Sequence, residues 1–130
     1  MTLSDGDVAL LARQAVDLFA PDIEIDIVPE DPVDPYRWGA QAWLVWPLID
    51  DRRSVGIRVA GSASPSEALA HLLDQLSDYG SETKRRWGVP FPPCPGHGHP
   101  ADVTAEDGDV VLRCPDTGDE IGRIRPDVAP

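Results

Sequence analysis

The chain has 130 residues with a formal net charge of −12, and 42% of its residues are hydrophobic. This length suits a single globular domain, and so negative a charge disfavours nucleic acid and anionic lipid as partners because both carry like charge. No apolar run is long enough to span a bilayer, and the first residues lack the basic region and cleavage site of a signal peptide, so we expect a cytoplasmic protein.

The first segment is expected to form a helix. Ser4 is a favourable N-cap, and Asp7 stands three positions later, as in an acidic form of the capping box. Pro21 is expected to end the helix just after Ala20. Apolar residues recur between these limits at helical spacing and predict one buried face: Val8, Leu11, Ala12, Ala15 and Phe19.

Three strands are expected to follow. Residues 22–28 alternate between isoleucine and acidic residues, which predicts a strand with one wet face. Residues 42–49 are apolar on both faces and predict a central strand, in which Pro47 removes one donor and requires a bulge or an edge. Residues 50–53 predict a turn. The return strand of this hairpin is indicated by alternating apolar residues: Val55, Ile57 and Val59.

A second helix has a clear start. Ser64 can cap it, Pro65 suits the first helical position, and Glu67 completes a capping box. Its buried face is predicted from the stripe Leu69, Leu72, Leu73, Leu76 and Tyr79. Residues 1–88 therefore predict an α+β domain of order α-β-β-β-α, with an antiparallel sheet covered on one face by two helices. Residues 89–130 predict a small β unit that is packed on this domain or appended to it.

A proline-rich acidic loop is expected between the first two strands. It carries Tyr36 and Trp38 close to Asp31 and Asp34. Large aromatic side chains on loops often anchor protein interfaces, so these four residues are candidates for binding a protein partner. The acidity of this region favours a partner with a basic surface, and a solvated acidic loop is the plainer alternative.

Two pentapeptides near the C-terminus carry the most specific chemistry. Residues 94–98 have the form C-P-x-H-G, and residues 114–118 have the form C-P-x-T-G. Between them, the Asp107-Gly108 pair predicts the tight turn of a β-hairpin, and residues 120–124 predict a further strand. Residues 90–125 resemble a zinc ribbon, a family in which two C-P-x-C-G turns joined by a hairpin hold one tetrahedral Zn²⁺.

The resemblance implies a set of metal ligands. Cys94 and Cys114 match the first ligands of the two turns, and His97 matches the second ligand of the first turn. Thr117 stands at the remaining position, and threonine is not a zinc ligand in such sites. His99 can repair the set, because two sulfur and two nitrogen donors suit zinc.

Other interpretations of this region stay open. One alternative is a ribbon that has lost its metal, which would leave the two cysteines close together as thiols or as a labile disulfide. A catalytic zinc held by Cys94, His97 and Cys114 would carry a water in its fourth position. The chain contains no H-E-x-x-H or deaminase signature, no P-loop lysine and no G-x-S-x-G.

These observations favour a non-enzymatic binding module with a structural Zn²⁺ and a protein partner. One alternative is an inhibitor or immunity-type protein that imitates the charge of nucleic acid toward a basic enzyme. A second alternative is a metal-dependent hydrolase. The composition, rich in Asp, Arg, Ala, Val and Pro and poor in Lys, is typical of a bacterial protein from a GC-rich genome.

Overall fold

A computed structural model describes residues 2–30, 41–49, 51–53, 55–80 and 91–129 of the chain. The four candidate partner-binding residues of the acidic loop lie outside these ranges: Asp31, Asp34, Tyr36 and Trp38. Among the described residues, neither helix combines the length and apolar character that crossing a bilayer requires.

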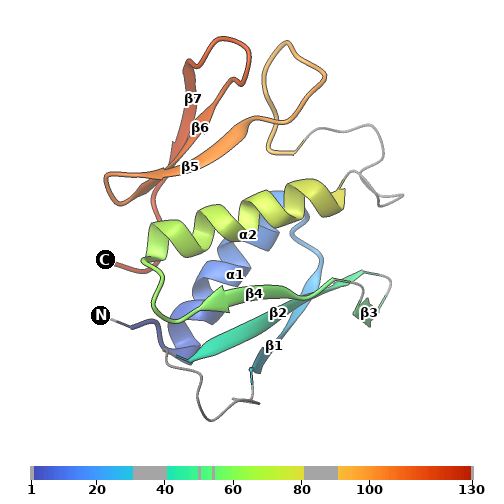
Figure 1. The fold of residues 1–130 in the computed structure, drawn as a ribbon. Coiled ribbons are helices and arrows are strands. Elements are labelled where there is room, and N and C mark those ends of the chain that lie inside the picture. The colour runs from blue at the N-terminus through green and yellow to red at the C-terminus, as the bar shows by residue number, and fades with distance from the viewer. Residues whose placement is uncertain (1, 31–40, 50, 54, 81–90, 130) are drawn as a thin grey trace.

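The fold belongs to the α+β class and contains two antiparallel sheets (Figure 1). In chain order, its elements are α1 (Asp5–Phe19), β1 (Glu24–Pro29), β2 (Ala42–Ile49), β3 (Arg52–Arg53), β4 (Ile57–Ala60), α2 (Pro65–Gly80), β5 (Asp102–Glu106), β6 (Asp109–Arg113) and β7 (Glu120–Ile124). In the first sheet β2 is central, with β1 on one side and β3 and β4 on the other. In the second sheet β6 lies between β5 and β7.

The pairing of β2 with its neighbouring strands explains how the sheet tolerates Pro47. Pro47 pairs in register with Ile25 of β1. On the opposite side, β4 pairs with β2 from Ala42 to Val45, and β3 pairs with β2 only at Leu48 and Ile49. The pairing is therefore interrupted at the proline, as a missing N–H requires. The prediction of a plain turn at residues 50–53 was wrong in part, because Arg52 and Arg53 form the short strand β3.

Both helices begin where side-chain capping predicts. The Ser4 hydroxyl accepts a hydrogen bond from the Asp7 amide at 3.2 Å, and the Asp7 carboxylate accepts one from the Ser4 amide at 2.9 Å. This reciprocal pair is a complete capping box. At the start of α2, the Ser64 hydroxyl accepts a hydrogen bond from the Glu67 amide at 3.2 Å. The hydroxyls thus satisfy amides that have no partner within the first helical turn.

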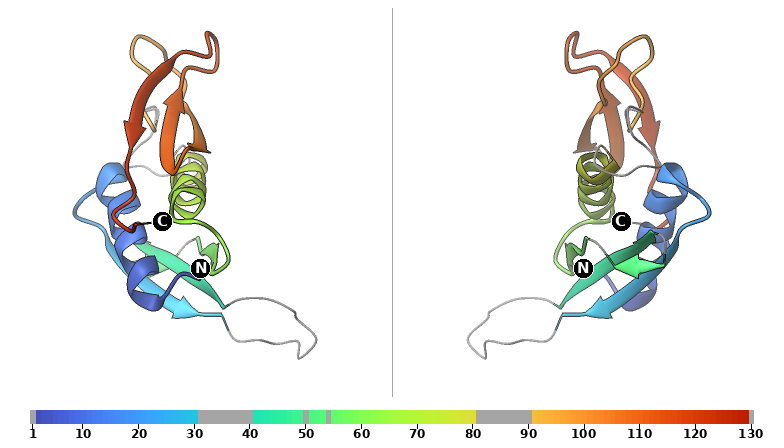
Figure 2. Two further views of the ribbon diagram at one scale, coloured as in Figure 1. Left: turned by 90° about the vertical axis from the view of Figure 1, so that its left-hand side faces the viewer. Right: turned by 90° about the vertical axis from the view of Figure 1, so that its right-hand side faces the viewer.

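Helix α2 lies between the two sheets (Figure 1). Its lower side in that view contacts α1 and β4, and its upper side contacts β5 and β6. The side views of Figure 2 show the second sheet standing above α2, at the opposite side of the helix from the first sheet. The second sheet therefore covers a helix face that the first sheet cannot reach.

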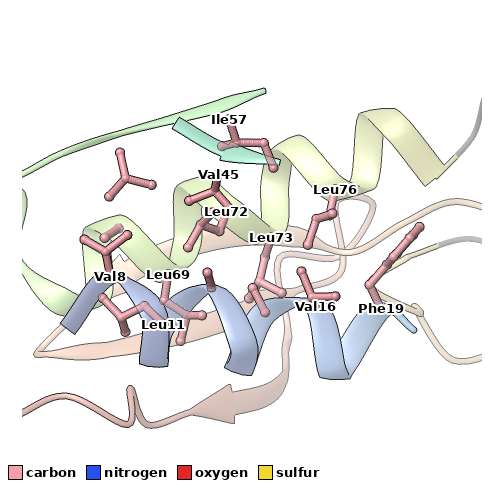
Figure 3. Close-up of a cluster of buried hydrophobic side chains, with 14 of the residues drawn as sticks. Val8, Leu11, Val16, Phe19, Val45, Ile57, Leu69, Leu72, Leu73 and Leu76 are labelled. Atoms are coloured by element: carbon pink, nitrogen blue, oxygen red, sulfur yellow. The ribbon is translucent and has the colours of Figure 1, made fainter. Parts of the chain in front are cut away.

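The main core lies between α1, α2 and the first sheet (Figure 3). Leucines of α2 meet apolar side chains of α1 and of the sheet, and the fully buried members include Leu11, Phe19, Val45, Leu69, Leu72, Leu73 and Leu76. A hydrogen bond also joins β2 to α1, because the indole N–H of Trp43 donates to the Asp5 carboxylate at 2.6 Å. The same core continues into the second sheet through Val110, and into the C-terminal segment through Val128.

A side chain of α1 also holds the segment that follows β7. The Gln14 amide N–H donates to the carbonyl oxygen of Arg125 at 2.7 Å, and its oxygen accepts a hydrogen bond from the amide of Asp127 at 2.9 Å. The two bonds imitate one step of strand pairing. Together with Val128, they fasten the second sheet to α1 as well as to α2.

Replacing a core leucine of α2 tests this packing. Leu73 is completely buried, and we expect Leu73→Ala to lower the free energy of unfolding by roughly 2–5 kcal/mol, because it removes buried methyl groups and leaves a cavity. Leu10 of α1 is 52% exposed, so Leu10→Ala is the matched control and should change stability by less than about 0.5 kcal/mol. Urea unfolding followed by circular dichroism measures both, and equal losses would contradict the packing described.

Candidate metal centre

The first pentapeptide forms a closed turn between α2 and β5. The His97 amide donates to the Cys94 carbonyl at 3.1 Å, and Gly96 takes a positive φ of 79° that favours glycine. The base of the loop is closed by pairing of Pro93 with Pro100. This backbone arrangement turns the chain back on itself, so residues three positions apart face the same point.

The second pentapeptide connects β6 to β7. The Gly118 amide donates to the Cys114 carbonyl at 2.7 Å, and Gly118 has a positive φ of 76°. The Cys114 amide donates in turn to the carbonyl of Asp119 at 2.9 Å. The hairpin before it turns at Asp107 and Gly108, which both have positive φ, as a two-residue hairpin loop of this kind requires. Both turns lie at the end of the second sheet that points away from the first sheet (Figure 1).

The two turns bring four side chains together. One potential ligand atom from each of Cys94, His97, His99 and Cys114 lies within 4.8 Å of the others. His97 Nδ1 is 3.2 Å from the Cys94 sulfur and 3.3 Å from the Cys114 sulfur. Sulfur and nitrogen ligands of one tetrahedral zinc stand about 3.6 Å apart when the bonds have their usual lengths. The cluster can therefore hold a metal ion, and its donor set and spacing fit Zn²⁺.

The two cysteines occupy a buried position below the exposed His97. Both are free thiols, with exposed fractions of 3% for Cys94 and 4% for Cys114. They form a small apolar cluster with Ala101, against which Leu112 and Ile121 pack. The sulfur atoms are thus fixed by the packing of the second sheet, whereas the imidazoles approach from the solvent side.

The two thiols differ in acidity. Burial raises the pKa of the Cys94 thiol above its usual value. Hydrogen bonds from the Thr117 hydroxyl and amide lower the pKa of Cys114 from its usual 9.0 to about 6. The thiolate, which is the form that binds metal, is therefore favoured at Cys114.

Thr117 has a role that the sequence pattern did not reveal. It stands where the resemblance would place a fourth ligand, and its hydroxyl donates to the Cys114 sulfur while accepting a hydrogen bond from the Asp119 amide at 3.2 Å. Thr117 thus supports a candidate ligand without being one of the four candidate donors itself. The position of Thr117 in the pentapeptide indicated that it lies near the candidate site. The spacing alone does not show that its hydroxyl bonds a thiolate.

Asp116 and Arg113 also contribute in ways that spacing did not show. Asp116 Oδ2 lies 3.0 Å from His99 Nε2, and this hydrogen bond raises the pKa of His99 above its usual value. Arg113 donates to both carboxylate oxygens of Glu106 and, at 3.3 Å, to the carbonyl of Gly118. The guanidinium therefore joins the hairpin to the second turn.

Comparison with known proteins adds no family to this description. No family model, curated protein or solved structure matches the chain. The evidence for the site is therefore its own geometry and the chemistry of its four donors.

The hydroxyl of Thr117 provides a test of the support for Cys114. In metal-free protein, Thr117→Val should raise the pKa of Cys114 toward its usual 9.0, because the main hydrogen bond to the thiolate is lost. Thr117→Ser should keep the lowered pKa. Titration of the ultraviolet absorbance of the thiolate measures the shift, with Cys94→Ser as the background so that a single thiol titrates.

The same pKa shift predicts how the stability of metal-free protein depends on pH. A folded-state pKa of about 6, below the usual 9.0, contributes stability that is present above pH 9 and is lost as the pH falls toward 6. This part of the pH dependence should shrink in Thr117→Val and persist in Thr117→Ser. Identical pH profiles for the two variants would contradict the role of the hydroxyl.

Proposed function

We propose that this chain is a non-enzymatic binding module whose C-terminal β unit is held by a structural Zn²⁺. The observation that carries the proposal is the convergence of two sulfur and two imidazole donors from two separate turns. Zinc is the metal that such a donor set suits best. The arrangement supports the resemblance to a zinc ribbon, with His99 in place of the ligand that Thr117 cannot provide.

A structural role for the metal follows from the packing around the cluster. Among the described residues, the end of the second sheet that bears the two turns has a small apolar cluster of Cys94, Ala101 and Cys114, with Leu112 and Ile121 packed against it. A cluster of this size contributes little apolar burial, and small domains commonly use a metal to hold such turns together. A metal bound both by residues 94–99 and by Cys114 would link the two turns and stabilise this end of the sheet.

The acidic side chains of the second sheet and its turns support a role other than hydrolysis. Asp116 is hydrogen-bonded to His99, and Glu106 is held by Thr104 and Arg113. The Thr104 hydroxyl and the Arg113 guanidinium lower the pKa of Glu106. These two carboxylates are thus engaged as hydrogen-bond acceptors, whereas a hydrolytic zinc site needs a base that is available to a bound water.

The charge of the chain supports a protein partner with a basic surface. Within the described ranges, Arg13, Arg53, Arg58, Arg113 and Arg123 each form an ion pair with a carboxylate of this same chain. Because each of these ion pairs is neutral, the formal net charge of the chain is still −12. A partner that carries positive charge would be attracted over a long range, as it would be for an inhibitor of a basic enzyme.

The metal is tested by elemental analysis and native mass spectrometry of protein purified without chelator or metal resin. We expect about one zinc per chain, and its removal by chelator should lower the melting temperature because the metal binds only the folded state. Cys94→Ser, Cys114→Ser and His97→Ala should each lose the metal. His71→Ala, which changes an exposed histidine on α2, is the matched control and should retain it.

Protein that folds, carries free thiols and takes up no zinc would exclude the structural metal. The β unit would then be a ribbon that has lost its ion and is held by its own packing. Zinc that is bound equally by Cys114→Ser and wild type would exclude this site as its location.

The basic partner is tested by capture from a bacterial lysate at low and at high salt. We expect a basic protein to be recovered at low salt and to be lost steeply as salt increases, because screening weakens attraction between opposite charges. A double variant, Asp31→Asn with Asp34→Asn, should recover less of it. Recovery that is independent of both salt and these substitutions would contradict an electrostatic interface.

A further inference from the structure

The four donors of the cluster are not held alike. His97 Nδ1 lies 3.2 and 3.3 Å from the two sulfur atoms, so Cys94, His97 and Cys114 form one compact group. The imidazole of His99 is instead engaged on both of its nitrogens. Nε2 is 3.0 Å from Asp116 Oδ2, and Nδ1 is 3.2 Å from the carbonyl oxygen of Pro100.

The hydrogen bonds of His99 compete with metal binding by the same imidazole ring. A ring nitrogen binds metal through its lone pair, whereas the carboxylate of Asp116 and the carbonyl of Pro100 accept hydrogen bonds only from a ring N–H. Ligation by His99 therefore requires it to release one of these two acceptors. His97 faces the sulfur atoms and needs no such exchange.

On the basis of the metal centre proposed above, we infer that Cys94, His97 and Cys114 form a fixed frame of three donors. The fourth position exchanges between His99 and an external neutral nitrogen donor, of which a histidine imidazole on a protein partner is the representative. Asp116 acts as a positioning residue, because it holds His99 when His99 is not on the metal.

Charge selects the class of external donor. Two thiolates cancel the charge of a divalent ion, so the three-donor frame with its metal is neutral. The carboxylate of Asp116 lies beside the position, and the chain as a whole carries −12. An anionic ligand is repelled in this setting, whereas a neutral imidazole is not, and imidazole is the commonest metal ligand that proteins present.

The position is also accessible to a partner. His97 is exposed, and the side chains of His99 and Asp116 are 34% and 66% exposed. The two buried cysteines lie on the opposite, protein-facing side of the cluster. A donor from another molecule can therefore approach without displacing the core, and the exchange of His99 would give the proposed binding module a specific contact.

The experiment uses the full chain loaded with Co²⁺ alone, followed by titration with imidazole and observation of the visible absorption bands of cobalt. Wild type should bind one Co²⁺ per chain, and imidazole should change its bands at saturation. His99→Ala should still bind one Co²⁺ and should bind imidazole about 10-fold more tightly, because the competing side chain is gone. Asp116→Asn should bind it roughly 3–10-fold more weakly, because His99 is then freer to occupy the metal.

Two controls keep these readings specific. His71→Ala removes a histidine on α2 and should respond to imidazole as wild type does. The cobalt content of the protein after gel filtration distinguishes imidazole that binds to the protein-bound metal from imidazole that removes the metal. Circular dichroism establishes that each variant is folded.

Several results would overturn the inference. Folded His99→Ala that binds no Co²⁺ would make His99 an obligatory ligand. Bands that imidazole leaves unchanged in both wild type and His99→Ala would show that no external donor enters. An imidazole affinity of Asp116→Asn equal to that of wild type would remove the role of Asp116. Failure of wild type to bind Co²⁺ would overturn the metal centre itself, which separates that failure from the others.

Discussion

The rest of the structure depends on the need to cover α2 on more than one side. Its buried residues spread beyond a single stripe and include Leu69, Ala70, Leu72, Leu73 and Leu76. One sheet cannot cover so wide an apolar surface on a helix. Helix α1 and the first sheet cover part of it, and β5 and β6 cover the part that remains. The β unit that carries the candidate metal centre is therefore also part of the cover of the main core.

This arrangement divides the second sheet into two ends with different physical support. Near α2, Val110 belongs to the main core, and apolar burial stabilises the strands. At the far end, the packing shrinks to the cluster around Cys94 and Cys114. Polar contacts and the candidate metal donors gather at this weaker end. A metal bound there would add stability where the hydrophobic core adds least.

Much of this fold could be predicted from the sequence because its signals are local. The capping box at Ser4 and the turn at Asp107 and Gly108 each lie within a few neighbouring residues, and the structure contains both. The predicted stripe of α2 is confirmed for its four leucines, whereas the side chain of Tyr79 lies outside the described part of the chain. The convergence of the two turns could be predicted because the two pentapeptides resemble each other. The short strand β3 was missed because Arg52 and Arg53 become a strand only through pairing with β2.

The finer features of the site could not be predicted because they join residues that are distant in the chain or depend on side-chain direction. His99 and Asp116 are 17 positions apart, and their contact requires both turns to be in place. Arg113 reaches Glu106 across the hairpin. Spacing indicates which donors are near, and only three-dimensional packing shows which of them are already bound to something else.

The hydrogen bonds of Gln14 have a consequence for the order in which the chain can fold. They join α1 to residues that follow it by 111 and 113 positions, so they can form only when almost all of the described chain has been synthesised. Contacts between such distant residues close large loops and are slow to form. An emerging chain would expose the outer face of α2 until β5 and β6 arrive, and the hydrogen bonds of Gln14 would form among the last contacts of the described residues.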